Sequence, residues 1–207
     1  MAAQYDATAG SYDTQPGHGI DEAERPAWER DVRPLLAIPP DAGVAVLGAG
    51  AGTGVFSRLL AEWGYRVIGI DVSQRMLDIA AANVPLHLAA QLDYRRGDAQ
   101  EDADAFPAGS FDLVASRQVV CHLSDPVRAF ANWQRWLKPG GRVIAIDGLW
   151  SREGWSGEFR DDIDRCPLSC VQTHRTLPYL LELAGFVVER CDWLENVNEP
   201  IVLSMCS

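Results

Sequence analysis

The sequence has no long apolar run, and it does not begin with a basic stretch followed by apolar residues. Its 207 residues include nothing near the ~20 consecutive apolar residues that a membrane-spanning helix needs. The first ten residues are small and polar, unlike a secretory signal peptide. We therefore expect a soluble, cytoplasmic protein that has no membrane partner.

Basic residues are scarce relative to acidic ones. The chain has 29 Asp and Glu against 18 Lys and Arg, which gives a formal net charge of -11. Proteins that bind a nucleic-acid backbone draw much of their affinity from Lys and Arg. The composition therefore argues against a nucleic-acid partner and favours an uncharged or cationic small molecule.

The cysteines are too scattered to form a disulfide framework. There are five of them, an odd number, and Cys166 and Cys170 lack the second pair that a zinc site usually shows. The acidic group Asp161, Asp162 and Asp164 is more typical of a solvated face than of a metal site. We predict ordinary thiols and no bound metal.

From position 44 onward, short apolar runs alternate with helical patterns. The predicted strands are Val44–Leu47, Arg66–Ile70, Leu92–Arg96, Phe111–Ser116, Arg142–Asp147, Phe186–Asp192 and Ile201–Met205. The predicted helices are Asp21–Leu36, Val55–Trp63, Gln74–Ala82, Pro126–Leu137 and Leu177–Ala184, with Ser73 and Asp125 as N-caps. Strands separated by helices imply right-handed crossovers and a mainly parallel sheet covered on both faces. We predict a single Rossmann-like α/β domain, a three-layer sandwich with its core in residues 41–207.

A glycine-rich turn, Gly50-Ala51-Gly52-Thr53-Gly54, joins the first predicted strand to the helix that follows. Such a turn lets backbone N–H groups approach a ligand closely. The dinucleotide fingerprint needs glycines at i and i+2 and a Gly or Ala at i+5. Whichever glycine is taken first, the i+5 residue is neither Gly nor Ala. The spacing is therefore not that of an NAD or FAD site.

Asp71 ends the second predicted strand. Ligands of open α/β sheets bind beyond the carboxyl ends of the strands. A carboxylate at that place can accept hydrogen bonds from both hydroxyls of a ribose, and capping of the next helix is the alternative role. We predict that Asp71 binds a ribose.

Four short motifs stand in register along the chain. They are Gly50-Ala51-Gly52-Thr53-Gly54, Gly69-Ile70-Asp71-Val72-Ser73, Gly97-Asp98-Ala99 and Leu137-Lys138-Pro139-Gly140-Gly141. Together they resemble the class I S-adenosylmethionine (SAM)-dependent methyltransferases. The resemblance implies a seven-stranded sheet with a reversed last strand, SAM as the cofactor and S-adenosylhomocysteine as its product.

The resemblance also implies the residues that contact the cofactor. The glycine turn would lie beside the methionine part, Asp71 on the ribose, and Asp98 and Ala99 beside the adenine. The complete cofactor-binding set implied is Tyr12, Gly48, Gly50, Ala51, Gly52, Gly54, Asp71, Val72, Met76, Asp98, Ala99, Ser116 and Arg117.

Gly48 departs from the family pattern. The family usually has an acidic residue at this position, two residues before the first glycine of the turn. That carboxylate normally helps to orient the turn and the methionine end of the cofactor. Water or another carboxylate can take its place, and the sequence leaves this open.

Candidates for the acceptor side follow the ends of the later strands. His122 is the candidate catalytic base, because imidazole titrates near neutral pH, and a packed or helix-capping histidine is the alternative. Arg117 can hold an acidic substrate or the cofactor carboxylate, or it can pair with a surface carboxylate. Asp147 and Trp150 are candidate substrate contacts. Trp150 and Trp155 can also form an aromatic wall against a flat substrate.

Tyr5 and Tyr12 lie in a segment that resembles the one many small-molecule methyltransferases fold over SAM. We therefore expect residues 1–40 to form an N-terminal lid segment with one helix, with Tyr5 on the substrate and Tyr12 on the cofactor. His18 and His174 are further candidates for the substrate pocket. A lid excludes water and shapes the acceptor pocket.

These features favour an enzyme that transfers a methyl group to O, N or C of a small metabolite, such as a natural-product intermediate of secondary metabolism. The alternative is a SAM-binding protein of the same fold that catalyses a non-methylating reaction such as cyclisation. We expect a monomer or a homodimer with a small-molecule acceptor as partner.

The glycine spacing predicts which nucleotide cofactor binds. Isothermal titration calorimetry should give binding heat with SAM or S-adenosylhomocysteine and none with NAD. Absence of heat with both sulfur ligands would refute the cofactor assignment.

Overall fold

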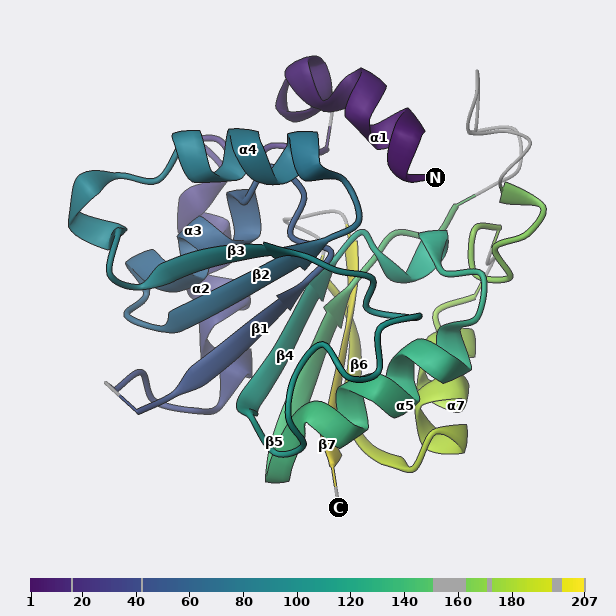
Figure 1. Cartoon of the computed structure of the whole chain (residues 1–207). Coiled ribbons are helices and arrows are strands. Elements are labelled where there is room, and N and C mark those ends of the chain that lie inside the picture. Colours follow the sequence, from purple (N-terminus) through teal and green to yellow (C-terminus); the bar gives the residue numbers. More distant parts are fainter. Residues whose placement is uncertain (16, 42, 151–162, 171–172, 195–198, 207) are drawn as a thin grey trace.

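The computed structural model describes residues 1–206 except 16, 42, 151–162, 171–172 and 195–198 (Figure 1). Within this part of the chain, seven strands form one sheet in the order β3-β2-β1-β4-β5-β7-β6. The strands are β1 (Ala45–Ala49), β2 (Arg66–Asp71), β3 (Leu92–Arg96), β4 (Phe111–Arg117), β5 (Leu137–Ile146), β6 (Phe186–Leu194) and β7 (Glu199–Cys206). The order reverses direction beside β1, the point at which open α/β sheets bind ligands.

The pairing of the strands confirms the predicted sheet. β1 pairs in parallel with β2 and β4, and the parallel pairing continues to β3 on one side and β5 on the other. β7 runs antiparallel to both β5 and β6. The last strand is therefore reversed, as the family resemblance implies.

Helices cover both faces of the sheet (Figure 1). The helices are α1 (Ala2–Thr8), α2 (Arg25–Asp31), α3 (Val55–Glu62), α4 (Gln74–Ala82), α5 (Pro126–Trp136) and α7 (Thr176–Leu183). Short 3₁₀ turns are η1 (Ala9–Thr14), η2 (Arg33–Leu36), η3 (Leu86–Leu88) and η4 (Val120–His122). In Figure 1, α5 and α7 lie in front of the sheet, and α2 and α3 lie behind it.

Each face of the sheet carries its own hydrophobic core. On the α5 side, Phe130, Trp133 and Trp136 are fully buried against the sheet. On the other side, α2 and α3 place Trp28 and Leu60 in a cluster with sheet residues such as Leu113. Burial on both faces is why the central strands are apolar throughout rather than alternating.

The two predicted N-caps fix the helices that lie nearest to the strand ends. The Ser73 hydroxyl accepts a hydrogen bond from the N–H of Met76 at 3.1 Å and starts α4. The Asp125 carboxylate accepts one from the N–H of Arg128 at 3.0 Å, and Pro126 occupies the first position of α5. Both caps satisfy donors that a helix start would otherwise leave unpaired.

The N-terminal forty residues differ from the expectation of a single helix. The predicted helix Asp21–Leu36 is split into α2 and η2, because Pro34 cannot continue an α-helix. An additional helix, α1, precedes it and lies beside α4 in Figure 1. Of the helices described, none is long and apolar enough to cross a membrane.

The two-sided core predicts how substitutions change stability. Leu113 is fully buried and Leu86 is 93% exposed. We expect Leu113→Ala to lower the free energy of unfolding by about 2–5 kcal/mol, because it leaves a cavity between the layers. The matched control Leu86→Ala should stay within about 0.5 kcal/mol. Urea unfolding measures both, and equal losses would contradict this assignment of the core.

Candidate cofactor and acceptor site

A cavity of about 410 Å³ lies at the carboxyl ends of the central strands, under the N-terminal segment. It brings together most of the predicted site residues. Those that line it are Tyr5, Tyr12, His18, Gly48, Gly50, Ala51, Gly52, Asp71, Val72, Met76, Asp98, Ala99, Arg117 and His122. Gly54, Ser116, Asp147, Trp150 and His174 are absent from its lining.

The glycine turn supplies the floor of the cavity, and its glycines have different physical roles. Gly52 has a φ of +54°, and a Cβ there would meet no atom within 4 Å, so the space beside it opens into the cavity. Gly54 has a φ of +80°, and a Cβ there would lie 2.4 Å from the Tyr94 hydroxyl. A glycine is therefore needed at position 54 because Tyr94 packs against it beneath the turn. Gly52 instead leaves room for a ligand to lie against its backbone.

Asp71 links the turn to the second strand. One carboxylate oxygen accepts a hydrogen bond from the N–H of Gly52 at 2.8 Å, and the other accepts one from the N–H of Ser73 at 2.9 Å. Burial raises the pKa of Asp71, and these amides oppose the shift. Each carboxylate oxygen still has a lone pair that can accept from a ribose hydroxyl.

The space that the family's acidic residue would need at position 48 is already filled. A Cβ on Gly48 would lie 2.9 Å from the Ser57 hydroxyl and 3.6 Å from the Cα of Gly69. Ser57 is buried on α3 and lines the cavity. Gly48 and Ser57 therefore form a matched pair, which sequence reasoning did not link because they belong to different elements.

Two Tyr-Asp pairs fasten the N-terminal segment over the cavity. The Asp6 carboxylate accepts a hydrogen bond from the Ser73 hydroxyl at 2.5 Å, and this bond lowers the pKa of Asp6. The Asp13 carboxylate accepts a hydrogen bond from the Thr53 hydroxyl. Tyr5 precedes Asp6 and Tyr12 precedes Asp13. The two hydrogen bonds of these aspartates therefore also hold both tyrosines at the cavity.

Four aromatic rings, His18, Tyr12, Tyr5 and His122, form what we call the aromatic row. Tyr12 stacks on His18 with ring centroids 4.3 Å apart. Tyr5 makes edge contacts with Tyr12 at 6.1 Å and with His122 at 5.6 Å. Burial lowers the pKa of His122 to about 4 and raises the pKa of both tyrosines. The row is therefore uncharged at neutral pH.

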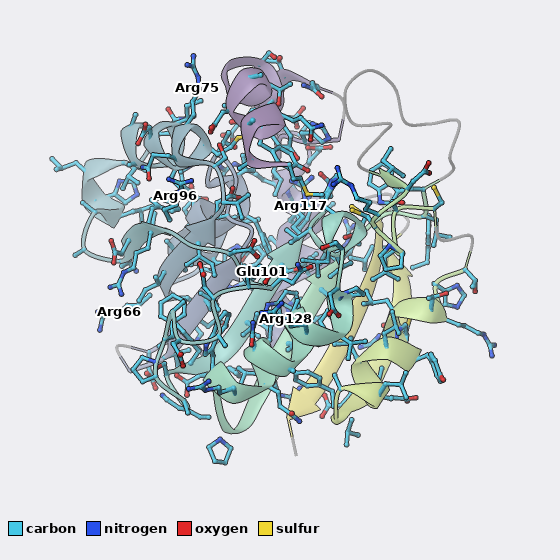
Figure 2. The ribbon with its side chains drawn as sticks, turned by 45° about the vertical axis from the view of Figure 1, so that its right-hand side comes forward. Arg66, Arg75, Arg96, Glu101, Arg117 and Arg128 are labelled. Atoms are coloured by element: carbon cyan, nitrogen blue, oxygen red, sulfur yellow. The ribbon has the colours of Figure 1, made fainter. Side chains whose placement is uncertain are left out.

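Arg117 ends β4 and contacts the N-terminal segment. Its guanidinium donates hydrogen bonds to the carbonyls of His18 at 2.8 Å and Gly17 at 2.6 Å. It also lies 5.2 Å from the centre of the Trp28 ring, a cation–π distance. Figure 2 labels Arg117 below the purple N-terminal helix. These contacts direct the side chain toward the backbone of the N-terminal segment.

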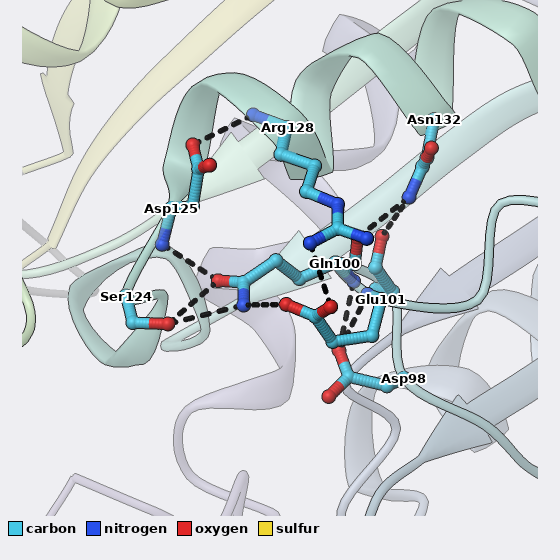
Figure 3. A network of polar contacts seen from close by, with 8 residues as sticks. Asp98, Gln100, Glu101, Ser124, Asp125, Arg128 and Asn132 are labelled. Atoms are coloured by element: carbon cyan, nitrogen blue, oxygen red, sulfur yellow. Dashed lines mark hydrogen bonds and ion pairs between the residues drawn. The ribbon is translucent and has the colours of Figure 1, made fainter.

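A polar network connects the predicted adenine loop to the segment after His122 (Figure 3). The Asp98 carboxylate accepts from the N–H of Gln100 at 2.8 Å. The Gln100 side-chain oxygen accepts from the N–H of Asp125 at 2.7 Å and from the Ser124 hydroxyl at 3.2 Å. Sequence reasoning did not identify Gln100, since its partners lie 24 and 25 residues away.

Asp147 is buried and forms a hydrogen-bonded cluster with the partly buried Trp150. The Asp147 carboxylate accepts hydrogen bonds from the Trp150 indole N–H at 2.9 Å, from the N–H of Gly148 at 2.9 Å and from the N–H of Cys121 at 3.2 Å. Burial raises the pKa of Asp147. Since Cys121 adjoins His122, the cluster supports the cavity wall from behind.

The other predicted residues fall into different settings. The Ser116 hydroxyl is buried in the sheet, and His174 is exposed beyond the cavity. Trp155, Asp161 and Asp162 lie outside the described residues. Among the residues that the structure describes, no group of three or more His, Cys, Asp or Glu is placed to hold a metal ion.

Comparison with known proteins gives the family of this fold and site. Residues 47–145 match the family model described as a methyltransferase domain. The chain is 35% identical over 103 residues to the ubiquinone biosynthesis O-methyltransferase of Pseudomonas paraeruginosa, covering 50% of this chain and 44% of that protein. The chain spans about half or less of the length of the curated relatives it matches.

Solved structures share the fold. Phosphoethanolamine N-methyltransferase 2 of Haemonchus contortus, in complex with SAM, has a TM-score of 0.66 at 25% identity, covering 89% of this chain and 42% of that chain. The cyclase SpnF has a TM-score of 0.72 at 19% identity, covering 99% of this chain and 94% of that chain. Residues 47–145 thus form a methyltransferase domain of the class I, SAM-dependent type, in the Rossmann-like fold that the sequence predicted.

The geometry of Asp71 predicts its effect on ligand affinity. Asp71→Ala should weaken S-adenosylhomocysteine binding by at least ~1–3 kcal/mol, because hydrogen bonds to a charged group are lost. Asp93→Ala, which removes an exposed carboxylate on β3, should bind like the parent. Calorimetry measures the affinities and a thermal melt verifies folding. Unchanged affinity in a folded Asp71→Ala protein would remove Asp71 from the ribose site.

Proposed function

We propose that this protein is an enzyme that transfers the methyl group of SAM to a small-molecule acceptor. The observation that carries the proposal is the single cavity in which the open face of Gly52, the Asp71 carboxylate and the aromatic row meet. Asp71 would hold the ribose, and Asp98, Ala99 and Met76 would surround the adenine. The glycine turn would lie along the methionine part, with Gly48 and Ser57 at its base.

The residues of this chain would act mainly by orientation. Bound SAM supplies an activated methyl group on a sulfonium, which an acceptor displaces in line. Holding the reactants in that geometry can supply up to about 7–11 kcal/mol of the barrier. The N-terminal segment excludes water, and a neutral His122 at the end of the aromatic row can accept a hydrogen bond from the acceptor.

The charges around the cavity support a small acceptor without an anionic group. Among the described residues that line the cavity, Arg117 is the single Lys or Arg, and it donates to the Gly17 and His18 carbonyls. Relatives named as O- and N-methyltransferases support oxygen or nitrogen as the acceptor atom. The net charge of -11 supports a partner other than nucleic acid.

A second candidate keeps the cofactor but changes the reaction. The likeness of the fold to the cyclase SpnF and the loss of the usual acid at Gly48 favour a non-methylating reaction such as cyclisation. Formation of S-adenosylhomocysteine separates the candidates, since only methyl transfer consumes SAM.

We also propose a role for the N-terminal segment, a location, an oligomeric state and a kind of metabolism for this protein. Residues 1–40 would act as a lid segment in which α1 and η1 cover the cavity, while α2 packs in the core. The protein would work in the cytoplasm, as a monomer or homodimer, on a metabolite of secondary metabolism. The residues of α1 and η1 that line the cavity support the lid role.

A metabolite screen tests the proposed function. Purified protein incubated with SAM and fractions of a bacterial small-molecule extract should release S-adenosylhomocysteine with particular fractions, detected by mass spectrometry. Gly52→Val should abolish the release, because a branched side chain would fill the open space beside the turn. Consumption of a fraction's compound without S-adenosylhomocysteine would instead favour the non-methylating candidate.

A further inference from the structure

His18 occupies the opposite end of the aromatic row from His122, and both rings line the cavity. The two histidines come from different parts of the chain, the N-terminal segment and η4. The Nδ1 atom of His18 is buried and has no hydrogen-bond partner in the part of the chain that the structure describes. A buried, unpaired ring nitrogen is costly unless something else pairs with it. This points to a ligand.

The backbone of His18 is fixed against the sheet from two positions. Arg117 donates to the carbonyls of His18 and Gly17, at 2.8 and 2.6 Å. The Gln118 side chain donates to the same Gly17 carbonyl at 3.0 Å. Hydrogen bonds from a guanidinium are among the stronger ones in proteins. The imidazole is therefore held in a set place although it lies on a loop.

The groups that face His18 tune its basicity. Burial lowers the pKa of His18, the Arg117 charge lowers it further, and Asp13 and the backbone of Tyr12 oppose the shift. His122 lies at the other end of the aromatic row, and burial lowers its pKa to about 4. A general base works best when its pKa lies near the working pH. With a pKa of about 4, His122 is a weak base at neutral pH, and the unpaired Nδ1 atom makes His18 the candidate base instead.

We propose that His18, positioned by Arg117, is the catalytic base of this site, and that its substrate is a neutral, flat hydroxyl compound such as a phenol. This inference rests on the proposed methyl transfer. The acceptor oxygen bonds to the methyl carbon while the carbon–sulfur bond breaks, and its electron pair stays on sulfur. The acceptor's proton passes to Nδ1 of His18 and then to solvent.

The acceptor class follows from the same residues. The rings of the aromatic row line the cavity, and aromatic rings pack well against a flat apolar compound. The Arg117 guanidinium is directed to the lid carbonyls, so a phosphate or carboxylate on the acceptor would lack a ready partner. A free amine attacks before it loses a proton, whereas a hydroxyl gains from a base during transfer. A buried imidazole nitrogen therefore fits a hydroxyl acceptor.

The test compares catechol, a neutral acceptor, with 4-nitrocatechol, which is largely ionised in mildly alkaline buffer. We expect His18→Asn to lower kcat/KM for catechol by about 100-fold or more, the contribution of a general base, and to change that for 4-nitrocatechol much less. His87→Asn, on the exposed η3 turn, is the matched control and should leave both values unchanged.

The pH profile for catechol gives a second readout. The base must be deprotonated, so activity should fall as pH drops through the pKa of His18, which burial lowers from the ordinary 6.5. Arg117→Met should move this fall to higher pH, because a neighbouring cation is lost, and Arg117→Lys should restore it.

Three results would overturn the inference. Equal losses for both catechols in His18→Asn would reduce His18 to a structural role. A fall in activity near pH 4, abolished by His122→Asn, would make His122 the base. Release of S-adenosylhomocysteine with extract fractions but with neither catechol would refute the acceptor class. Failure of the protein to bind S-adenosylhomocysteine at all would instead refute the proposed methyl transfer, on which this inference rests.

Discussion

The amide of Gly52 and the carboxylate of Asp71 meet 2.8 Å apart, at the carboxyl ends of two neighbouring strands. This hydrogen bond holds the glycine turn in a left-handed backbone conformation that leaves Gly52 facing open space. It also keeps an acidic group at the end of β2, next to β1, the strand beside which the strand order reverses. The floor of the cavity, the proposed ribose contact and the room for a methionine chain all depend on it. A backbone hydrogen bond from the N–H of Ala51 to the carbonyl of Ile70, at 2.8 Å, adds a second link between the turn and β2.

Hydrogen bonds to carboxylates also attach the N-terminal segment to the residues that form the floor of the cavity. Asp6 bonds to Ser73 at the start of α4, and Asp13 bonds to Thr53 within the glycine turn. The N-terminal segment is therefore tied to the two elements that would hold the cofactor. Closing the cavity and placing the aromatic row are therefore one structural event.

The parts of the fold governed by local patterns could be predicted from the sequence. α4 and β3 begin and end at the predicted residues: the Ser73 cap starts α4, and Leu92 and Tyr94 alternate with charged residues along β3. The proline that splits Asp21–Leu36 was visible, but its effect depends on how α2 packs. Gln100, Ser57 and the Arg117 contacts could not be predicted, because each joins segments that are far apart in the chain. The site was thus predictable in its cofactor half and much less so in its acceptor half.

The most direct test of this account is a crystal structure of the protein with S-adenosylhomocysteine. The account predicts ribose hydroxyls on Asp71, the methionine chain along Gly52, and the sulfur facing the aromatic row under the N-terminal segment. A ligand that binds elsewhere, or in the cavity with its sulfur turned away from His18 and His122, would contradict it.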